Sequence, residues 1–358
     1  MEETKDGQTS SHTQMDYNTV PENEDFPKPL SQPPPELSRQ VEYDRAMRAE
    51  AAVKAGPALS RNEFIYEDEW MIAVNKPSGV YCEHVLSSIP ELLASSPSSA
   101  GAANDVNPLE LHLANRLDRD TSGVMVITKL HKIAGQLVKA FTDRKVRKTY
   151  LALCIGPAPK WNNIYIESGH GRSKFGAWRV YSRTDVGRIL PGGTVVREMA
   201  THLKVLAVNA NHRMHRDSVD KAQNSSQGIA FDLKEDRFAT VGDNGSTDSI
   251  EKVVVTEQNS KAPGQDRDIV SSPNIRKNDE VLIRASPLSG RTHQIRLHCQ
   301  YMGLPIRGDV KYEGPHIWKG ITYANHALHA ESLCFEHPVT NNMVKFHAPL
   351  PQWVMEAY

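Results

Sequence analysis

The chain has 358 residues, 39% of them hydrophobic, a fraction low enough to predict segments that do not fold. Its net charge of −1 combines −5 on residues 1–60 and −2 on residues 209–279 with +6 on the remainder, which suits a polyanion binder although many metabolic enzymes are similar. No run of about 18 apolar residues is present and the start MEETKDG is acidic, so we expect neither a membrane-spanning segment nor a secretory leader.

An acidic N-terminal tail is predicted over residues 1–61. Residues 1–35 are rich in Glu, Ser, Thr and Pro and show no apolar period, so we expect them to be disordered. A helix is expected over 38–55. No S4-like RNA-binding module is recognisable before residue 62.

The first ordered part is predicted over residues 62–208. IYEDEWMIAVNKP reads as a turn and a strand that stops at KPSG. The small polar residues of 87–107 indicate a surface loop that can include one short helical turn. From residue 111 onward we expect the buried strand GVMVITK, then a helix with apolar residues four apart, and then the strand YLALCIG. Another strand is predicted over 195–208, after a loop-rich piece.

Residues 209–279 are dominated by polar residues and glycine. A structureless stretch of this length is unusual inside a compact domain, so we predict a low-complexity, disordered insertion. The same domain is expected to continue over 280–358, with a strand and turn in EVLIRASPLSG and a helix in RTHQIRLHCQYMG that Thr292 can cap. The tail 327–358 alternates short strands and turns.

The motif RLDRDTSG places two arginines and two aspartates in five positions directly before a buried strand. It could be an ordinary turn in which Asp120 or Thr121 bonds to nearby backbone. It could equally hold a carboxylate beside a guanidinium, which keeps the acid ionised for use as a nucleophile or base. Asp118 fits the second interpretation, because Leu117 anchors one side.

A second cluster of charge follows in FTDRKVRKTY, where Arg144, Lys145, Arg147 and Lys148 lie at a predicted helix end. Cations there complement the helix dipole, and four of them beside an aromatic residue also suit a phosphate backbone and a stacked base. Tyr150 begins a strand, so it could be ordinary half-buried packing.

The third cluster, GRTHQIRLH, places Arg291, His293, Arg296 and His298 around one helix start, where free backbone N–H groups attract anions. The histidines are five apart, do not share a helix face and have no carboxylate between them, so we predict no metal site. A metal-dependent hydrolase is a third hypothesis that rests on the histidines alone. The sequence contains no P-loop, dinucleotide fingerprint or G-x-S-x-G motif.

NKPSGV, RLDRDTSGVMVITK, KTYLALCIG, GRTHQIRLHCQYMGLPIRGDVKYEG and ALHAESLCFEHP, in this order and separation, resemble the motifs of the RluA family of RNA pseudouridine synthases. The resemblance covers roughly 62–208 and 280–358. It implies an α+β catalytic domain around a long mixed, mostly antiparallel sheet flanked by helices and loops, with a central active-site cleft. It also implies action on RNA without cofactor or metal. We expect a monomer.

The resemblance assigns roles to individual residues. Asp118 matches the essential aspartate, Tyr150 the tyrosine that stacks on the target base, and Arg296 the basic partner of the aspartate. Arg116 matches the arginine that fills the gap left by the flipped nucleotide. The further expected RNA contacts are Arg119, Arg144, Lys145, Arg147, Lys148, Arg291 and His293.

The implied reaction breaks the bond from C1′ to N1 of uridine and rejoins the base through C5, so the base must leave the helix. Asp118 could attack C1′ to form a sugar ester or remove the 2′ proton to give a glycal, and both routes stay open. Tyr150 would hold the detached uracil and could help to take the C5 proton. Whether the substrate is rRNA, tRNA or mRNA also stays open. The alternative function is a non-catalytic RNA-binding or RNA-chaperone protein with the same fold.

Four cysteines stand far apart and form no C-x-x-C pair, so we expect reduced thiols rather than a disulfide framework or a zinc ribbon. Organelle presequences are rich in Arg and poor in acidic residues, unlike the start of this chain. The predicted compartment is therefore the cytoplasm or the nucleus.

Overall fold

The computed structural model describes residues 25–94, 110–212, 250–258 and 278–358, and the elements below belong to these residues. The strands of the main sheet are β1 (Phe64–Glu67), β2 (Met71–Lys76), β3 (His112–Leu113), β4 (Ser122–Thr128), β5 (Arg147–Gly156), β6 (Asn163–Arg172), β7 (Trp178–Tyr181), β8 (Arg197–Val208), β9 (Asn211–His212), β10 (Glu251–Val254), β11 (Asp279–Pro287), β14 (Leu328–Glu336) and β15 (Met343–His347). A separate hairpin joins β12 (Ile317–Trp318) and β13 (Ile321–Thr322).

The helices are α1 (Leu37–Ala55), α2 (Cys82–Ala94), α3 (His131–Thr142), α4 (Gln294–Tyr301) and α5 (Gln352–Ala357). Single 3-10 turns occur at η1 (Arg61–Glu63), η3 (Arg183–Asp185) and η5 (Val310–Tyr312). Within the described residues, no helix combines the length and the apolar character needed to cross a membrane.

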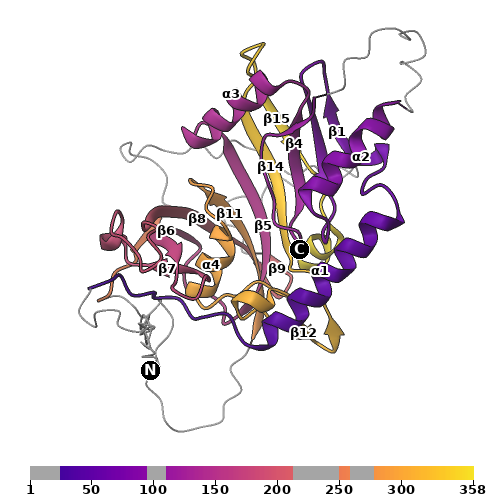
Figure 1. Ribbon diagram of the computed structural model, residues 1–358. Coiled ribbons are helices and arrows are strands. Elements are labelled where there is room, and N and C mark those ends of the chain that lie inside the picture. Colours follow the sequence, from indigo (N-terminus) through magenta and orange to yellow (C-terminus); the bar gives the residue numbers. More distant parts are fainter. Residues whose placement is uncertain (1–24, 95–109, 213–249, 259–277) are drawn as a thin grey trace, which may run out of the picture.

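The main sheet follows the order β1-β2-β4-β14-β5-β11-β8-β6-β10, with β3, β7, β9 and β15 paired to single neighbours off this path. Strands β4 and β14 are parallel, as are β6 and β10, and the other pairs are antiparallel. The long sheet crosses the whole molecule, with helices against it (Figure 1). The predicted α+β fold with a mixed, mostly antiparallel sheet is confirmed.

Strands β2 and β4 are covered on both faces. Alternate residues of a strand point to opposite sides, so Met71 and Ala73 pack in the cluster that includes α3, whereas Ile72 and Val74 pack in the cluster that includes α2. A third and larger cluster joins β5, β11, β8 and β6 to α4 and the C-terminal α5. At the middle of the sheet, β14, which packs in the cluster that includes α3, meets β5 and β11, which pack in the third cluster (Figure 1).

The RLDRDTSG motif is held close to β14 by Gly123. Its φ is +111°, and an added Cβ would lie 2.2 Å from the carbonyl oxygen of Ala330. Only glycine tolerates both this backbone conformation and this approach. The parallel pairing of Ser122 with His329 and of Gly123 with Ala330 therefore fixes the motif at the centre of the sheet.

Two expected loops contain regular structure. Residues 87–107 were predicted to form a surface loop, but α2 occupies the part up to Ala94. Val85 and Ile89 are fully buried against the β2–β4 face, and this helical spacing outweighs the polar composition. Strand β6 falls partly in the piece predicted to be loop-rich.

The insertion predicted over 209–279 also contains a strand. β10 pairs in parallel with β6, with Val253 opposite Ile166, because its short apolar run completes an otherwise open sheet edge. The prediction of disorder is therefore wrong for residues 251–254. It is also wrong for β9 (Asn211–His212), which pairs with β8, and for Asp279, which begins β11. Residues 213–249 and 259–277 lie outside the described residues.

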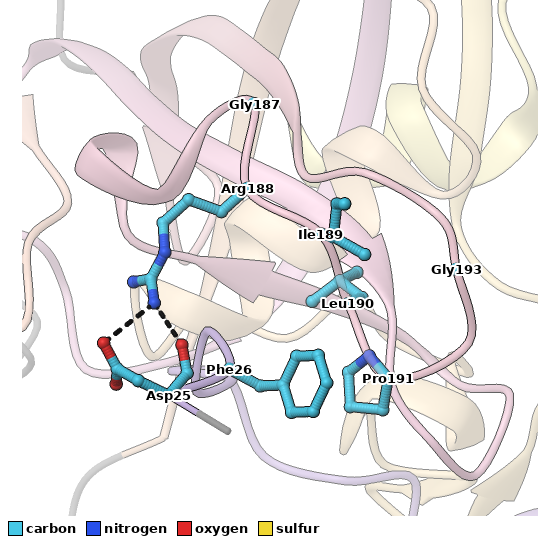
Figure 2. A pocket seen from close by; sticks show the side chains of 8 residues that line it. All are labelled: Asp25, Phe26, Gly187, Arg188, Ile189, Leu190, Pro191 and Gly193. Atoms are coloured by element: carbon cyan, nitrogen blue, oxygen red, sulfur yellow. Dashed lines mark hydrogen bonds and ion pairs between the residues drawn. The ribbon is translucent and has the colours of Figure 1, made fainter. Parts of the chain in front are cut away.

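The tail before α1 is ordered from residue 25 onward, against expectation. The backbone N–H of Leu30 donates to the carbonyl of Val180 at 2.7 Å, and the hydroxyl of Ser31 accepts from Arg179 and from the N–H of Val180. This segment thus supplies hydrogen-bond partners to the backbone at the free edge of β7. Farther back, the guanidinium of Arg188 contacts both the carboxylate and the carbonyl of Asp25 (Figure 2). The expectation for residues 1–24 lies outside the described residues.

Candidate active site

A cleft of about 660 Å³ opens at the middle of the sheet. Its wall is built from the segment before β4, the end of α3, β5, the start of β8 and the turn before α4. The sequence-predicted residues that the structure brings together there are Arg116, Asp118, Arg144, Lys148, Tyr150, Arg291, His293 and Arg296.

Three predicted RNA contacts do not line this cleft. Arg119 makes a two-pronged ion pair with Asp120 (2.6 and 3.0 Å) and a third contact with Glu42 of α1. Arg147 is exposed and directs its guanidinium toward the sulfur of Cys334. Lys145 is also exposed. Arg119 does not face the cleft because its charge is already neutralised by the carboxylates of Asp120 and Glu42.

The Asp118 carboxylate forms the floor of the site. Its Oδ2 accepts a hydrogen bond of 2.7 Å from Arg296, and 28% of its side chain is still exposed to the cleft. Burial alone would raise the pKa of the Asp118 carboxyl, but the charge of Arg296 outweighs burial and holds that pKa well below its usual range. Asp118 is therefore an ionised carboxylate with one face open.

Arg296 is held from behind by Asp309. Two hydrogen bonds of 2.6 and 2.8 Å join its guanidinium to both oxygens of the Asp309 carboxylate, leaving one nitrogen for Asp118. Burial disfavours the charge, but Asp309 and Asp118 outweigh it and raise the pKa of Arg296. Because a two-pronged pair fixes the guanidinium plane, Arg296 has no freedom to turn away from Asp118.

His293 sits next to this ion pair in an unusual backbone conformation. It precedes α4 with φ of 58°, and no side chain caps this helix. The predicted cap at Thr292 is therefore wrong; the Gln294 side chain bonds to the N–H of Arg291 instead, closing the turn locally. His293 Nδ1 bonds to the Tyr312 hydroxyl at 2.7 Å, and its Nε2 faces Asp118 at 3.8 Å.

Burial, together with the charge of Arg296, lowers the pKa of His293 to about 3. The ring is thus neutral near pH 7 and does not compete with Arg296 as the cation beside Asp118. Its partner Tyr312 also lies under the Arg296 guanidinium, 5.0 Å from the ring centroid.

A buried lysine ties the loop of Asp118 to the loop after β2. Lys76 is fully buried, and its Nζ donates to the carbonyls of Pro77, Val80 and Arg119 at 2.7–2.9 Å. Burial lowers the pKa of Lys76 to about 8. The bond to the Arg119 carbonyl fixes the backbone one residue after Asp118.

We expect Lys76→Met to lower the free energy of unfolding by about 2 kcal/mol, because three part-buried carbonyls each lose a hydrogen bond from the ammonium group. Urea unfolding of this variant, compared with the exposed Lys132→Met, measures the effect. Equal stability of the two variants would show that the three bonds contribute nothing net.

Tyr150 presents its ring to the cleft from the start of β5. It lies opposite Ala285 on β11 and Ala330 on β14, whose small side chains leave room beside the ring. Burial, with a contribution from the negative charge of Asp118, raises the pKa of Tyr150. A phenolate that could take the C5 proton is therefore disfavoured, whereas a neutral ring face suits stacking on a base.

Cations form one wall of the cleft. Lys148 Nζ donates to the carbonyl of Ser289 at 2.9 Å, and Arg144, Arg197 and Arg291 line the same wall. Glu198 pairs with Arg144 at 2.7 Å, so part of this charge is balanced. Burial, with the charges of Arg144 and Arg291, lowers the pKa of Lys148 to about 8. The wall suits a phosphate backbone.

The low pKa of Lys148 predicts a pH dependence of RNA binding. In the free protein Lys148 loses its proton near pH 8, and a bound phosphate would raise that pKa again, so binding takes up a proton and weakens above pH 8. We expect affinity for a uridine-rich RNA to fall up to about tenfold between pH 7.5 and 9. Lys148→Arg, which keeps its charge throughout, should bind equally well across this range. Fluorescence anisotropy measures both, and an identical decline in Lys148→Arg would exclude Lys148 as the cause.

Sequence reasoning missed several residues of the site. Asp309 and Tyr312 lie in GDVKYEG, inside a motif that carried the resemblance, but no role was assigned to them. Lys76 was noted only as part of a strand stop. Arg197 had no signal beyond its charge. His298, which was grouped with the site, is fully buried and bonds to Ser168 and Thr201.

The histidines of the described chain do not gather into a metal centre. In residues 25–94, 110–212, 250–258 and 278–358, no group of three or more His, Cys, Asp or Glu side chains is arranged to hold a metal ion.

Comparisons with known proteins agree with the motifs. Residues 70–301 match the family described as RNA pseudouridylate synthase. "RNA pseudouridine synthase 1" of Oryza sativa subsp. japonica is 48% identical over 93% of this chain and 84% of its own length, and the protein of that name in Arabidopsis thaliana is 47% identical over 92% and 88%. "Ribosomal large subunit pseudouridine synthase C" of Pasteurella multocida is 26% identical over 80% of this chain and 64% of its own length.

Among solved structures, human RNA Pseudouridylate Synthase Domain Containing 1 is 18% identical, with a TM-score of 0.46, over 81% of this chain and 83% of that chain.

Proposed function

The chain belongs to the RNA pseudouridylate synthase family, and we propose that it isomerises specific uridines in RNA to pseudouridine with Asp118 as the catalytic residue. The motif resemblance to this family is thereby confirmed. The observation that carries the assignment of Asp118 is its 2.7 Å bond to Arg296 at the floor of the cleft. An ionised, oriented and partly exposed carboxylate is what either route to the sugar requires.

The reaction requires the cleft to hold an extruded nucleotide. The bond from C1′ to N1 breaks, the uracil turns, and a new bond joins C1′ to C5; N1 gains a proton and C5 loses one. Asp118 acts on the sugar, either at C1′ or at the 2′ proton. Tyr150 stacks on the uracil and keeps it in place between the two bonding steps.

Arg116 is proposed to fill the gap that the flipped nucleotide leaves in the RNA. Its side chain is 74% exposed at the cleft rim, where it pairs with Glu83 at 3.1 Å. An exposed ion pair of this kind contributes at most about 1 kcal/mol. Arg116 can therefore exchange Glu83 for RNA at little cost, whereas Arg296 is locked in place.

We propose that the catalytic domain comprises 62–208 and 280–358, because β8 and β11 are direct neighbours although the insertion separates them in sequence. We propose that the enzyme is a monomer. We expect it to act in the cytoplasm or the nucleus. The name of the Pasteurella relative makes large-subunit ribosomal RNA a first substrate to test, without excluding tRNA or mRNA.

The test uses purified full-length protein and unmodified transcripts that carry [5-³H]uridine. Because C5 loses its hydrogen, a synthase releases tritium to water and leaves pseudouridine in the digested RNA. RNA binding without release of tritium from rRNA, tRNA or mRNA transcripts would support the alternative RNA-chaperone role. Mapping pseudouridine across the RNA of cells with and without the protein then identifies the modified positions.

A further inference from the structure

The helix α1, which precedes the region that matches the family, directs a charged side chain into the body of the enzyme. Arg45 is 3% exposed, although it lies in the middle of a helix on which only Ser38, Arg45 and Ala49 are buried. The larger apolar residues of this helix face solvent, including Leu37 and Met47. A helix that served only to cover the core would bury its apolar side chains instead.

The Arg45 guanidinium connects two segments that are distant in sequence. One nitrogen donates to the Asp120 carboxylate at 3.3 Å, and the other donates to the carbonyls of Gly308 and Tyr323 at 2.9 and 3.1 Å. On the next turn back, Glu42 reaches Arg119 at 3.1 Å. Thus α1 touches the loop of RLDRDTSG and the turn before η5 at the same time.

One of these segments contains Asp118, and the other contains Asp309, which contacts Arg296. Asp120 lies two residues after Asp118, and the turn between them is closed by the N–H of Thr121 bonding to the Asp118 carbonyl. Gly308 precedes Asp309, which clamps Arg296 by two hydrogen bonds. The contacts form a ring that runs from Arg45 through Asp120 to Asp118, and from Arg45 through Gly308 and Asp309 to Arg296.

We propose that Arg45 is a positioning residue, which fixes the two segments relative to each other so that Asp118 and Arg296 meet in the geometry needed for catalysis. This inference rests on the proposed function and deepens it, since it makes the N-terminal helix a part of the active-site architecture. Arg45 itself does not line the cleft and does not contact substrate.

A guanidinium suits this position for a geometric reason. Its planar fork presents several donors at fixed angles, so one side chain can bond to a carboxylate and two carbonyls at once. A lysine supplies the charge from a single point and cannot keep all three contacts. An apolar residue of similar length leaves Asp120 with Arg119 alone and leaves the Gly308 carbonyl with only the N–H of Val310.

The test compares Arg45→Met and Arg45→Lys with Arg48→Met in the full chain. Arg48 lies one turn further along α1, is exposed and donates to the Asp44 carbonyl at 3.4 Å, so it is the matched control. Tritium release from [5-³H]uridine transcripts gives kcat and KM. We expect Arg45→Met to lower kcat by about tenfold to a hundredfold with KM within about twofold, Arg45→Lys to lie between it and wild type, and Arg48→Met to match wild type.

Hydrogen–deuterium exchange supplies a readout that needs no substrate. Peptides covering 114–121 and 305–312 should exchange faster in Arg45→Met than in wild type or Arg48→Met. Unchanged exchange in both peptides, or a kcat within twofold of wild type, would overturn the proposal. If Arg45→Met does not fold, the same two measurements on Arg45→Lys decide in the same way.

Failure of the inference differs from failure of the proposed function. A wild-type protein that releases no tritium contradicts the synthase activity, while the exchange of the two peptides still tests whether Arg45 holds them together. A general loss of folded protein would also lower the apparent kcat with KM unchanged, but it would speed exchange in peptides far from α1 as well. Faster exchange confined to the two peptides therefore separates the positioning role from a loss of folded protein.

Discussion

Asp118→Asn should reduce pseudouridine formation by about 10⁴-fold or more, because the amide can neither attack C1′ nor accept the 2′ proton. The change is nearly isosteric and the oxygen of the new amide can still accept the hydrogen bond from Arg296, so the fold should persist. RNA affinity should stay within a few-fold of wild type, since the cationic wall is untouched. Tritium release and fluorescence anisotropy measure the two quantities on one preparation.

The control for this variant is Asp143→Asn. Asp143 ends α3 near the cleft and pairs with Lys139 on the surface at 2.7 Å, so it tests the loss of one carboxylate without touching the site. We expect wild-type activity from it. Residual tritium release from Asp118→Asn at a tenth of the wild-type rate would be incompatible with Asp118 as nucleophile or base.

The contact between Asp118 and Arg296 was implied by the family resemblance, and each of the two residues lies in a dense local motif. RLDRDTSG combines opposite charges with a buried strand, and GRTHQIRLH combines cations with a helix start. The buried run IAV and the helical spacing of Ile133 and Leu137 likewise predicted β2 and α3, which the structure contains. In these cases the signal and the structure lie within one turn or one strand of each other.

Contacts between residues far apart in the sequence leave no local pattern from which they could be predicted. Arg45 meets Asp120 across 75 residues and Gly308 across 263, and no local period encodes either meeting. The buried face of α1 carries no apolar stripe, so its attachment to the enzyme could not be predicted from the pattern. Strand β10 is similar, because a four-residue run becomes a strand only where β6 offers it an edge.

The polar composition misled the prediction for α2. Small residues in SSIPELLASS indicate a loop, but Val85 and Ile89 repeat at helical spacing and find a hydrophobic face on β2 and β4. Packing of the apolar stripe supplies most of the stability of a short helix and outweighs its modest intrinsic propensity. The helical spacing of the apolar residues, if given more weight than the polar composition, predicts a whole helix here and not a single helical turn.

Replacement of Arg296 by Gln should have the second largest effect, and here two consequences can be separated. The substitution removes the partner of Asp118, and it also leaves Asp309 buried without a counter-ion. Breaking a buried pair in this way costs about 3 to 5 kcal/mol of stability. We expect Arg296→Gln to unfold at clearly lower urea concentration and to lose about 10² to 10³ in kcat, as the charge that orients Asp118 disappears.

The double variant Arg296→Gln with Asp309→Asn distinguishes the two effects. Two neutral amide side chains can bond to each other, so no unpaired charge is left in the core and most of the lost stability should return. Activity should not return, because no cation faces Asp118.

The loss of Arg296 should also change the pH dependence of the reaction. Without Arg296, burial raises the pKa of Asp118, so the acid limb of the rate profile should move to higher pH in both variants. Recovery of kcat together with stability in the double variant would show that Arg296 serves the fold alone.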